Sequence, residues 1–427
     1  MELAVLIGGA MAGTLDLSGR EPAFTYNQDY ASGTGPPLSV RFPLTGLRAE
    51  GKELRFWLEG LLPDHPETLR ALRAEHELAY SDTLHLLGTP MGADCAGAVQ
   101  FCPPEQALAL ATKPGGADPI STAEIAEWLK AISTNPALRV QRSLSSDSGF
   151  SLAGMQPKVA VRRTTEDGWA VPYGAVPTTH IIKAVRSDAF PHEAVVEHLT
   201  QAIAARCGLP AAHTTTDVYD GLEVIIVKRY DRLADASGRI HQEDMCQVLS
   251  RPPDLKYQRD GGPSPDEIAE VLNTHCEGTG DLERFCDYLL FQWITASTDG
   301  HAKNYGLMLL GAGIVRLAPL YDTASWLPYH RGQSNRLIRL SMKMGKDYRL
   351  QSADRPSAIQ HTSRRLGLQP LAVAERAARL AAAVPAAIGA ALDTLPGEMA
   401  GIAEVDTLVS AVCERAALCE AIAHRVA

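Results

Sequence analysis

The pattern of apolar and polar positions divides the chain into a β-rich beginning, a mixed middle and a helical end. Residues 1 to about 50 carry short apolar segments such as ELAVLIGG and LSVRFPL, separated by the turn cluster YASGTGPP, which predicts strands. From 54 to 76 the pattern becomes helical, with interruptions near Pro63 and Pro66. Ser121 and Glu124 form a candidate capping box at the start of the helix EIAEWLKAIS.

The middle of the chain combines strands with one helix. The strand-like segments KVAVRR, WAVPY, THIIKAV and VYDGLEVIIVKRYD surround HEAVVEHLTQAIAARCG, a helix that should end at Gly208. After about 240 the pattern is mainly helical, apart from the strands NYGLMLL and GIVRLAPLYD. An alanine-rich helical tail begins at 371, and we expect Pro385 to break it. The whole pattern predicts an α+β protein.

Length and composition bound the domain organisation. At 427 residues the chain exceeds the usual limit of about 250–300 residues for one core, so several domains are expected. The glycine-containing segment TKPGGAD is the best linker candidate. We therefore expect a β-rich N-terminal domain at 1–110, a linker and helix at 111–145, a first lobe at 146–235 and a mainly helical lobe at 236–427.

Charge and composition narrow the class of protein. A content of 45% hydrophobic and 21% charged residues is typical of a folded soluble protein, and a net charge of −10 argues against a surface that binds nucleic acid by itself. The N-terminus lacks signal-peptide features, and no apolar run approaches the roughly 20 residues that span a bilayer, so we expect a cytoplasmic protein without a membrane contact. The eight cysteines show no zinc spacing and are expected to be reduced, mostly buried thiols.

The hexapeptide DGHAKN carries the densest group of reactive side chains. Asp299 follows an apolar helix, Asn304 precedes a strand, and Asp322 ends the next strand. In phosphoryl-transfer enzymes an Asp and an Asn five residues apart serve as catalytic base and metal ligand, and a second Asp completes the metal site. Carboxylate and amide oxygens suit a hard cation such as Mg²⁺. The ordered set predicts a magnesium-dependent phosphotransferase.

Two other segments are candidates for holding a nucleotide. The segment SSDSGFSLAGMQPKVAV has glycines at Walker A spacing but neither the lysine nor the helix of that motif, so it predicts a phosphate loop of another kind, leading to Lys158. Lys183 lies among apolar neighbours and needs a partner; Glu193, at the start of the next helix, is the nearest by position. Backbone groups at 228–230 could meet an adenine edge.

Taken together, these residues resemble the HipA family of serine/threonine kinases, which are toxins of bacterial toxin–antitoxin pairs. The resemblance runs essentially end to end, through FWLEGLLPD, GADCAGAVQ, SLAGMQPK, PTTHIIK, VKRYDR, HQEDMCQ, KYQRDGGP, FQWITASTDGHAKN and PLYD. It implies a two-lobed protein-kinase-like fold, related to the phosphatidylinositol kinases, beside a small β-rich N-terminal domain. The kinase N-lobe would then be 146–235 and the C-lobe, with the catalytic loop, 236–427.

The resemblance also implies roles for the site residues. Asp299 would be the catalytic base, Asn304 and Asp322 the Mg²⁺ ligands, and Lys183, paired with Glu193, the lysine on the ATP phosphates. The implied nucleotide-binding residues are Leu152, Ala153, Gly154, Met155, Gln156, Pro157 and Lys158 in the phosphate loop, Lys228, Arg229 and Tyr230 in the hinge, and His301, Ala302, Lys303, Asn304, Tyr321 and Asp322 around the catalytic loop. Pro157 and Lys228 depart from the residues common in the family.

Ser151 matches the family's inhibitory autophosphorylation site. A phosphate there would add about −1.5 to −2 charges beside the site for the phosphates of ATP and favour ejection of the loop.

The implied function is ATP- and Mg²⁺-dependent phosphorylation of a serine or threonine in a protein, typically an aminoacyl-tRNA synthetase, which would inhibit translation. The family also implies a HipB-like helix-turn-helix antitoxin as partner, with DNA contacted only through it. A second hypothesis stays open: a catalytically silent kinase-fold scaffold that binds an antitoxin or operator complex. A metal-dependent hydrolase is less well supported, since the chain has no H-x-x-x-H or H-x-D cluster.

Overall fold

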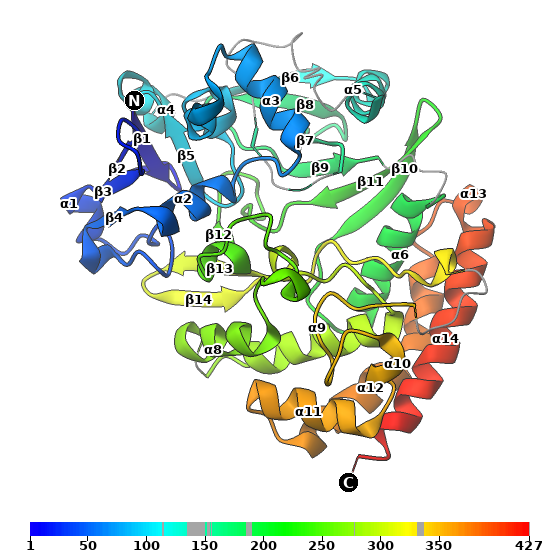
Figure 1. The fold of residues 1–427 in the computed structure, drawn as a ribbon. Helices are drawn as coiled ribbons and strands as arrows, with labels where there is room; N and C mark the ends of the chain where they lie inside the picture. Colours follow the sequence, from blue (N-terminus) through cyan, green and yellow to red (C-terminus); the bar gives the residue numbers. More distant parts are fainter. Residues whose placement is uncertain are drawn as a thin grey trace.

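The chain folds around three antiparallel sheets, as the ribbon in Figure 1 shows. This computed structural model describes residues 1–112, 115–134, 150–151, 154, 156–184, 190–276, 278–330 and 337–426, without the side chains of 80–82. The phosphate-loop candidates Leu152, Ala153 and Met155 therefore lie outside the described residues. The fold class is α+β, as predicted, with a two-lobed kinase-like body beside an N-terminal β-rich domain.

The N-terminal domain is built on a five-stranded sheet in the order β4-β3-β2-β1-β5. Its strands are β1 (Glu2–Ile7), β2 (Ala10–Asp16), β3 (Ala23–Tyr26), β4 (Arg48–Glu50) and β5 (Val99–Cys102), and its helices α1 (Gln28–Ala31), α2 (Lys52–Glu59), α3 (Pro66–Glu75) and α4 (Ala107–Thr112). Phe24, Trp57 and Phe101 are fully buried in its core. The sequence indicated that the helical segment is interrupted near Pro63 and Pro66. In the structure, Pro63 lies between α2 and α3, and Pro66 is the first residue of α3.

The N-lobe contains a six-stranded sheet in the order β10-β11-β9-β7-β8-β6. Its elements are β6 (Gly116–Ile120), α5 (Thr122–Thr134), β7 (Lys158–Arg163), β8 (Trp169–Tyr173), β9 (His180–Lys183), α6 (Glu193–Arg206), β10 (Thr214–Tyr219) and β11 (Leu222–Lys228). Ser121 and Glu124 form the predicted capping box of α5 through reciprocal bonds of 2.9 and 3.2 Å. Strand β6, which pairs with β8, lies inside the segment where the sequence indicated a linker.

The C-lobe is a helical layer beneath a three-stranded sheet (Figure 1). Its strands are β12 (His241–Asp244), β13 (Gly306–Gly311) and β14 (Ile314–Leu317), and its helices α7 (Met245–Val248), α8 (Pro265–His275), α9 (Asp281–Thr295), α10 (Leu350–Ala353), α11 (Pro356–Leu366), α12 (Pro370–Leu392), α13 (Gly397–Ala400) and α14 (Ala403–Ala423). The expected break at Pro385 was wrong, because α12 continues through it. Packing of α12 against α6, α9 and α14 offsets the one hydrogen bond that proline removes.

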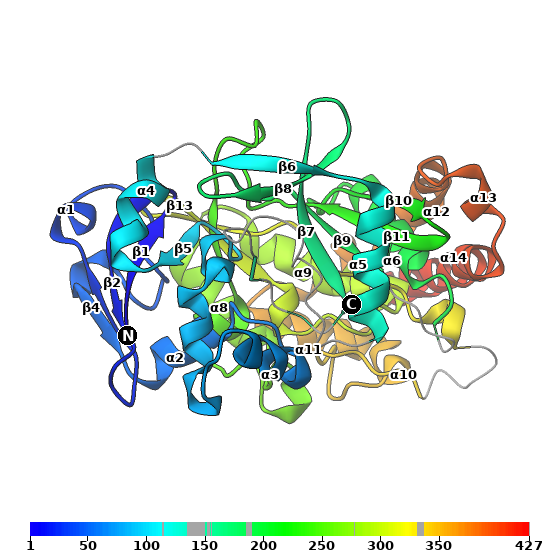
Figure 2. The ribbon, with the colours of Figure 1, turned by 90° about the horizontal axis from the view of Figure 1, so that it is seen from above.

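The N-terminal domain lies beside β12 and β13 and along the edge of the N-lobe (Figures 1 and 2). Buried polar contacts fasten it to both lobes. The carboxylate of Glu243 in β12 accepts hydrogen bonds from the indole of Trp57 (2.8 Å) and the backbone of Val40 (2.9 Å), and Asp94 pairs with Arg232 at 2.8 Å. The domain is therefore docked with a fixed geometry, which matters for the cleft that it borders.

The cysteines agree with their expected role, since all eight are free thiols and six are buried. Within the described residues, no helix combines the length and apolar character that a bilayer crossing requires.

Candidate active site

Asp299 lies on a short loop held by a buried helix. Trp293 and Ile294 at the end of α9 are fully buried, and Ala296 ends the helix in a left-handed conformation with φ of 50°. The side chain of Asp299 is 66% exposed and faces a cleft between the lobes. The hydroxyl of Tyr257 donates to its Oδ1 at 2.8 Å, which orients one oxygen, and the other oxygen, Oδ2, lies 3.8 Å from Nε2 of His301.

Asn304 connects the two candidate carboxylates through their backbones. Its Nδ2 donates to the carbonyl of Asp299 at 2.9 Å and to the carbonyl of Asp322 at 3.1 Å. Because both partners are acceptors, the amide nitrogen must face them, which leaves the amide oxygen on the other side. The structure thus brings Asp299, Asn304 and Asp322 together, although 18 positions separate the last two in the chain.

Lys183 lies opposite this group and forms two ion pairs. Its ammonium contacts Oδ1 of Asp322 and Oε1 of Glu197, the latter at 3.0 Å. The prediction that Glu193 pairs with Lys183 was wrong, because Lys183 pairs with Glu197, one helical turn further along α6. Glu193, at the start of α6, instead faces the phosphate loop and accepts a hydrogen bond from Gln156 at 3.0 Å.

The lysines and carboxylates of the cleft shift one another's pKa values. Burial disfavours the charge of Asp322, but the ammonium of Lys183 outweighs it and lowers the pKa of Asp322. Burial and the neighbouring Glu197 raise the pKa of Glu193 to about 7. Burial, together with the ammonium of Lys183, lowers the pKa of Lys158 to about 8. Groups whose charge is adjusted in this way are frequent in binding and catalytic clefts.

The described part of the phosphate loop lies over Lys158. Gly154 has a φ of 111°, and a Cβ atom at that position would collide with the ammonium of Lys158. Glycine therefore lets the backbone approach this cation closely. Gln156 and Pro157 continue the loop into β7, and Gln156 ties it to α6 through Glu193.

Ser151 is buried at the contact with the N-terminal domain. Its Oγ donates to the carbonyl of Leu61 at 2.7 Å, and its amide donates to the carbonyl of Asp94 at 3.0 Å. The residue is fully excluded from solvent. In this conformation the hydroxyl anchors the loop and is not presented to the cleft.

The hinge residues are placed by the sheet and by a buried charge network. Lys228 and Arg229 use their backbone amides within the lobe, toward the carbonyls of His213 and Thr179. The guanidinium of Arg229 is buried on Asp231 rather than turned to the cleft. Separately, Tyr230 packs its ring 5.3 Å from that of Tyr321, which closes one wall of the cleft.

The remaining residues of the catalytic loop form a tight turn. His301 is buried with its Nε2 3.8 Å from Asp299, and burial lowers the pKa of its imidazole. Ala302 begins a 3-10 turn (Ala302–Asn304) and donates its amide to the carbonyl of Lys256 at 3.2 Å. The ammonium of Lys303 points to the N-terminal domain, where it contacts Asp64 at 2.6 Å.

These groups line one continuous cleft with a volume of about 290 Å³. Its walls come from all three parts of the protein. Sequence-predicted residues on the walls are Gly154, Gln156, Lys158, Lys183, Glu193, Lys228, Arg229, Tyr230, Asp299, His301, Lys303, Asn304, Tyr321 and Asp322. Ser151, Pro157 and Ala302 lie behind the walls.

The donor set fits a magnesium ion with a nucleotide. Asp322 offers a carboxylate, and the amide oxygen of Asn304 is the end not engaged by backbone carbonyls. Lys158 and Lys183 supply positive charge on the same side for phosphate groups. The amide of Asn304 is already placed by hydrogen bonds, whereas the ammonium of Lys183 would have to release Oδ1 of Asp322 before that oxygen could hold a cation.

Comparison with known proteins agrees with this geometry. Residues 3–102 match the HipA N-terminal domain, and residues 150–388 match the HipA-like C-terminal domain. The chain belongs to the HipA family. The putative kinase Y4mE of Sinorhizobium fredii is 32% identical over 325 residues, which is 74% of each chain. The serine/threonine-protein kinase toxin HipA of Shewanella oneidensis is 25% identical over 439 residues, covering 97% of this chain and 96% of the relative.

The fold of this HipA-family kinase has a solved counterpart. The structure of the Shewanella oneidensis MR-1 toxin–antitoxin system HipA, HipB and operator DNA complex superposes with a TM-score of 0.83 at 23% identity, and the match covers 99% of each chain. The two-lobed architecture with an N-terminal domain is thereby shown for the whole chain.

Several residues of the cleft were not singled out from the sequence of this HipA-family chain. They include Gly60, Asp64, Ala96, Glu197, Gln242 and Asp244, and Tyr257 contacts Asp299 without lining the cleft. Asp64 lies in LLPD and Tyr257 in KYQRD. Both segments resemble the family, but the resemblance implied no function for these two side chains. For Glu197, helical spacing was the available signal, because positions four apart share one face of α6.

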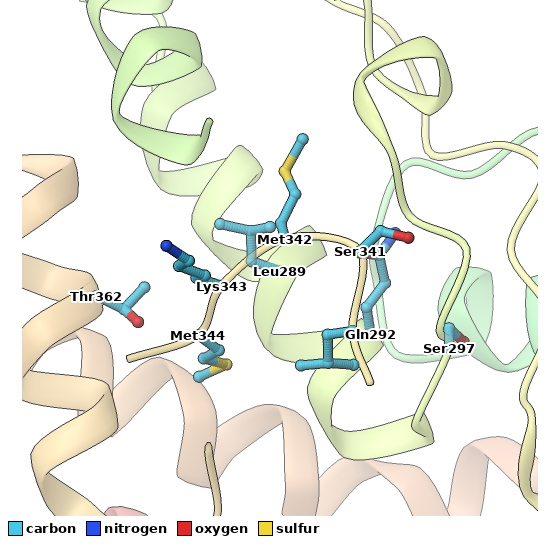
Figure 3. Close-up of a pocket in the computed structure, with 9 residues that line it drawn as sticks. Leu289, Gln292, Ser297, Ser341, Met342, Lys343, Met344 and Thr362 are labelled. Carbon is cyan, nitrogen blue, oxygen red and sulfur yellow. The ribbon is translucent and has the colours of Figure 1, made fainter. Parts of the chain in front are cut away.

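A second small cavity behind the catalytic loop shows how the loop is supported. Figure 3 shows Gln292 and Ser297 facing the segment that carries Ser341 and Met342. Oε1 of Gln292 accepts a hydrogen bond from Tyr305 at 2.6 Å, and a Cβ atom on Gly300 would collide with this amide. The volume of about 10 Å³ is at the lower limit for a cavity that holds one water molecule. The loop bearing Asp299 therefore rests on a polar, closely packed support.

Proposed function

We propose that this chain is an ATP- and Mg²⁺-dependent serine/threonine protein kinase that acts as the toxin of a toxin–antitoxin pair. The observation that carries the proposal is the bridge of Asn304 between Asp299 and Asp322, with Lys183 on the second carboxylate. This arrangement places a base, two metal-binding oxygens and a phosphate-binding cation around one cleft. Phosphoryl transfer depends mostly on such positioning and electrostatics.

Each residue has one task in the proposed reaction. Asp299, held by Tyr257, accepts the proton of the acceptor hydroxyl, which can reach its carboxylate because the side chain is 66% exposed. Asn304 and Asp322 would hold Mg²⁺, and the chemistry that it supplies when bound is neutralisation of charge on the phosphates. Lys183 orients the α- and β-phosphates while Glu197 fixes the position of its ammonium.

The nucleotide would lie along the cleft from the hinge to the phosphate loop. The ring of Tyr230 lies at the hinge end, where the adenine would meet the backbone of 228–230. Gly154 and Lys158 lie at the other end, under the phosphates. The tyrosine–tyrosine wall favours a flat aromatic base at the hinge, since ring faces pack well on one another.

Phosphate transfer by a purified Asp299→Ala variant tests the proposal. We expect transfer of labelled phosphate from ATP to fall by about 10²–10⁴-fold, because the proton acceptor is lost. Binding of ATP and the melting temperature should remain near those of the wild type. Asp406→Ala, an exposed aspartate in the first turn of α14, is the matched control and should keep full activity. Undiminished transfer by Asp299→Ala would refute the assigned base.

Membership in the HipA family suggests an antitoxin partner and a protein that accepts the phosphate. A HipB-like helix-turn-helix antitoxin is proposed as partner, and the solved complex of the Shewanella oneidensis proteins supports this. The net charge of −10 suits docking of a basic protein, with DNA contacted only through it. An aminoacyl-tRNA synthetase is the proposed acceptor, with inhibited translation as the consequence. Phosphopeptide mass spectrometry of cells expressing the wild type or Asp299→Ala would identify it.

Ser151 is the proposed self-inhibitory site. Its hydroxyl is bonded to the carbonyl of Leu61, so a phosphate would place negative charge against carbonyl oxygens and expel the loop. The same phosphopeptide experiment detects this modification. The scaffold hypothesis is less well supported, because a silent protein has no need of the Asp299, Asn304 and Asp322 arrangement; ATP binding without turnover would favour it.

A further inference from the structure

The segment after helix α2 carries an aspartate that reaches into the kinase cleft from the N-terminal domain. Asp64 lies between Pro63 and Pro66, whose rings restrict the backbone on either side. Its side chain is 10% exposed, and its Oδ1 accepts from the ammonium of Lys303, itself 6% exposed, at 2.6 Å. This is a buried contact between two domains and not a surface salt bridge.

The second oxygen of Asp64 makes the pair asymmetric. Oδ2 is buried and has no hydrogen-bond partner among the residues that the structure describes. Lys303 is therefore the ion-pair partner of this carboxylate, and removal of either member leaves the other buried, with the charges of Asp244 and Lys158 in the surroundings. Such a loss is costly in a site shielded from water. The pair consequently fixes the position of Lys303 strongly.

Fixing Lys303 also fixes the metal-binding residues. Lys303 precedes Asn304 in the 3-10 turn, and its carbonyl accepts a hydrogen bond from Tyr321 at 2.7 Å. Tyr321 is in turn adjacent to Asp322. One ammonium thus connects the N-terminal domain to both residues that would hold the cation.

The same segment holds the other side of the cleft. The carbonyl of Leu61 accepts the hydroxyl of Ser151 at the start of the phosphate loop. Residues 61–64 therefore contact the phosphate loop with one end and the catalytic loop with the other.

We propose that Asp64 is a positioning residue of the kinase, acting through Lys303, and that the N-terminal domain is a structural part of the catalytic centre. The inference rests on the proposed function for its effect on turnover. The structural part of the proposal is that Asp64 orders the loop from Asp299 to Asn304. This order can be measured even if the protein shows no kinase activity.

A double-mutant cycle on Asp64→Asn and Lys303→Met tests the proposal in the full-length chain. We expect each substitution to lower kcat about tenfold, because the reacting groups are misplaced, and Asp64→Asn, which leaves every implied nucleotide-binding residue in place, to change KM for ATP less than twofold. The double variant should be no slower than the slower single variant, since both break one contact. Losses that multiply would overturn the proposal.

Hydrogen exchange of the peptide spanning 299–305 gives a second readout. Exchange should be faster in Asp64→Asn and unchanged in Glu53→Gln, which breaks an exposed ion pair with Arg41 in the same domain. A general loss of stability would instead speed exchange throughout the chain. If Asp64→Asn fails to fold, Lys303→Met alone must show the local change.

The two readouts separate the two proposals. A wild type that transfers no phosphate refutes the proposed function, but exchange still tests the pair. An active wild type whose kcat and exchange are insensitive to Asp64→Asn refutes this inference alone.

Discussion

Two charged clusters in this kinase use the same kinds of side chain for different purposes. The cleft cluster consists of Lys183, Glu197 and Asp322. The interface cluster, between the N-terminal domain and the hinge, consists of Asp94, Asp231, Arg229, Arg232 and Arg239. In the cleft cluster Lys183 and Glu197 are 9% and 6% exposed but Asp322 is 42% exposed, whereas every side chain of the interface cluster is only 2–7% exposed. A ligand can reach the first cluster but not the second.

The two clusters differ in how many of their polar atoms have hydrogen-bond partners within the protein. In the interface cluster, the guanidinium of Arg229 donates to Asp231, to the hydroxyl of Thr178 and to the carbonyl of Cys95. Burial disfavours the charge of Asp94, yet the surrounding guanidinium groups outweigh it and lower its pKa. Saturated contacts of this kind specify how domains dock, whereas in the proposed function the ammonium of Lys183 exchanges the carboxylate of Asp322 for a phosphate.

Substitution of Lys183 should give the largest effect on catalysis. Lys183→Met removes the cation proposed for the phosphates, so we expect kcat/KM for ATP to fall by about 10²–10³-fold. The folded state should lose less stability than in an interface variant, because the side chain of Asp322 is 42% exposed and Glu197, whose pKa is raised by burial, can take up a proton. Steady-state kinetics with labelled ATP and thermal unfolding check both parts. A fall in stability as large as that of an interface variant would remove the distinction between the clusters.

Substitution of Asp94 should lower the stability of the fold more than it lowers catalysis, which is the opposite of the effect expected for Lys183. Asp94→Asn keeps the side-chain shape but leaves three buried arginines with one carboxylate, so the free energy of unfolding should fall by about 3 kcal/mol. Urea unfolding of the variant measures this loss. Glu53→Gln, which breaks an exposed pair, is the control and should change the stability by less than about 1 kcal/mol. An Asp94→Asn protein as stable as this control would show that the cluster does not secure docking.

The contrast between local and distant contacts explains what the sequence could predict. The segment from Asp299 to Asn304 is short, and its chemistry follows from residue types at a fixed spacing between apolar elements. The strands of the N-lobe and the capping box of α5 were predicted for the same reason. Lys183 was recognised as a buried cation, but its partner was assigned to Glu193 because chain distance does not specify which turn of α6 lies opposite the lysine.

Contacts between domains left no pattern in the sequence. Asp64 and Lys303 are 239 positions apart, and nothing local indicates that they meet. The interface cluster joins GADCAG to KRYDR in the same way, and neither segment alone predicts its partner. Continuation of α12 through Pro385 also depends on tertiary packing, which a local rule for proline does not include. Sequence therefore predicted which side chains line the cleft better than how the cleft is assembled.

The cleft should also differ from the interface in its response to pH, with a smaller effect than either substitution. Lys158 has a pKa near 8, so its ammonium loses its proton as the pH rises from 7 to 9. If this charge holds the phosphates, kcat/KM for ATP should fall by about tenfold over that range. Lys158→Arg should keep a flat profile, because a guanidinium stays protonated. A wild-type profile that is equally flat, measured at saturating Mg²⁺, would show that the charge of Lys158 is not used, and the phosphates would then depend on Lys183 alone.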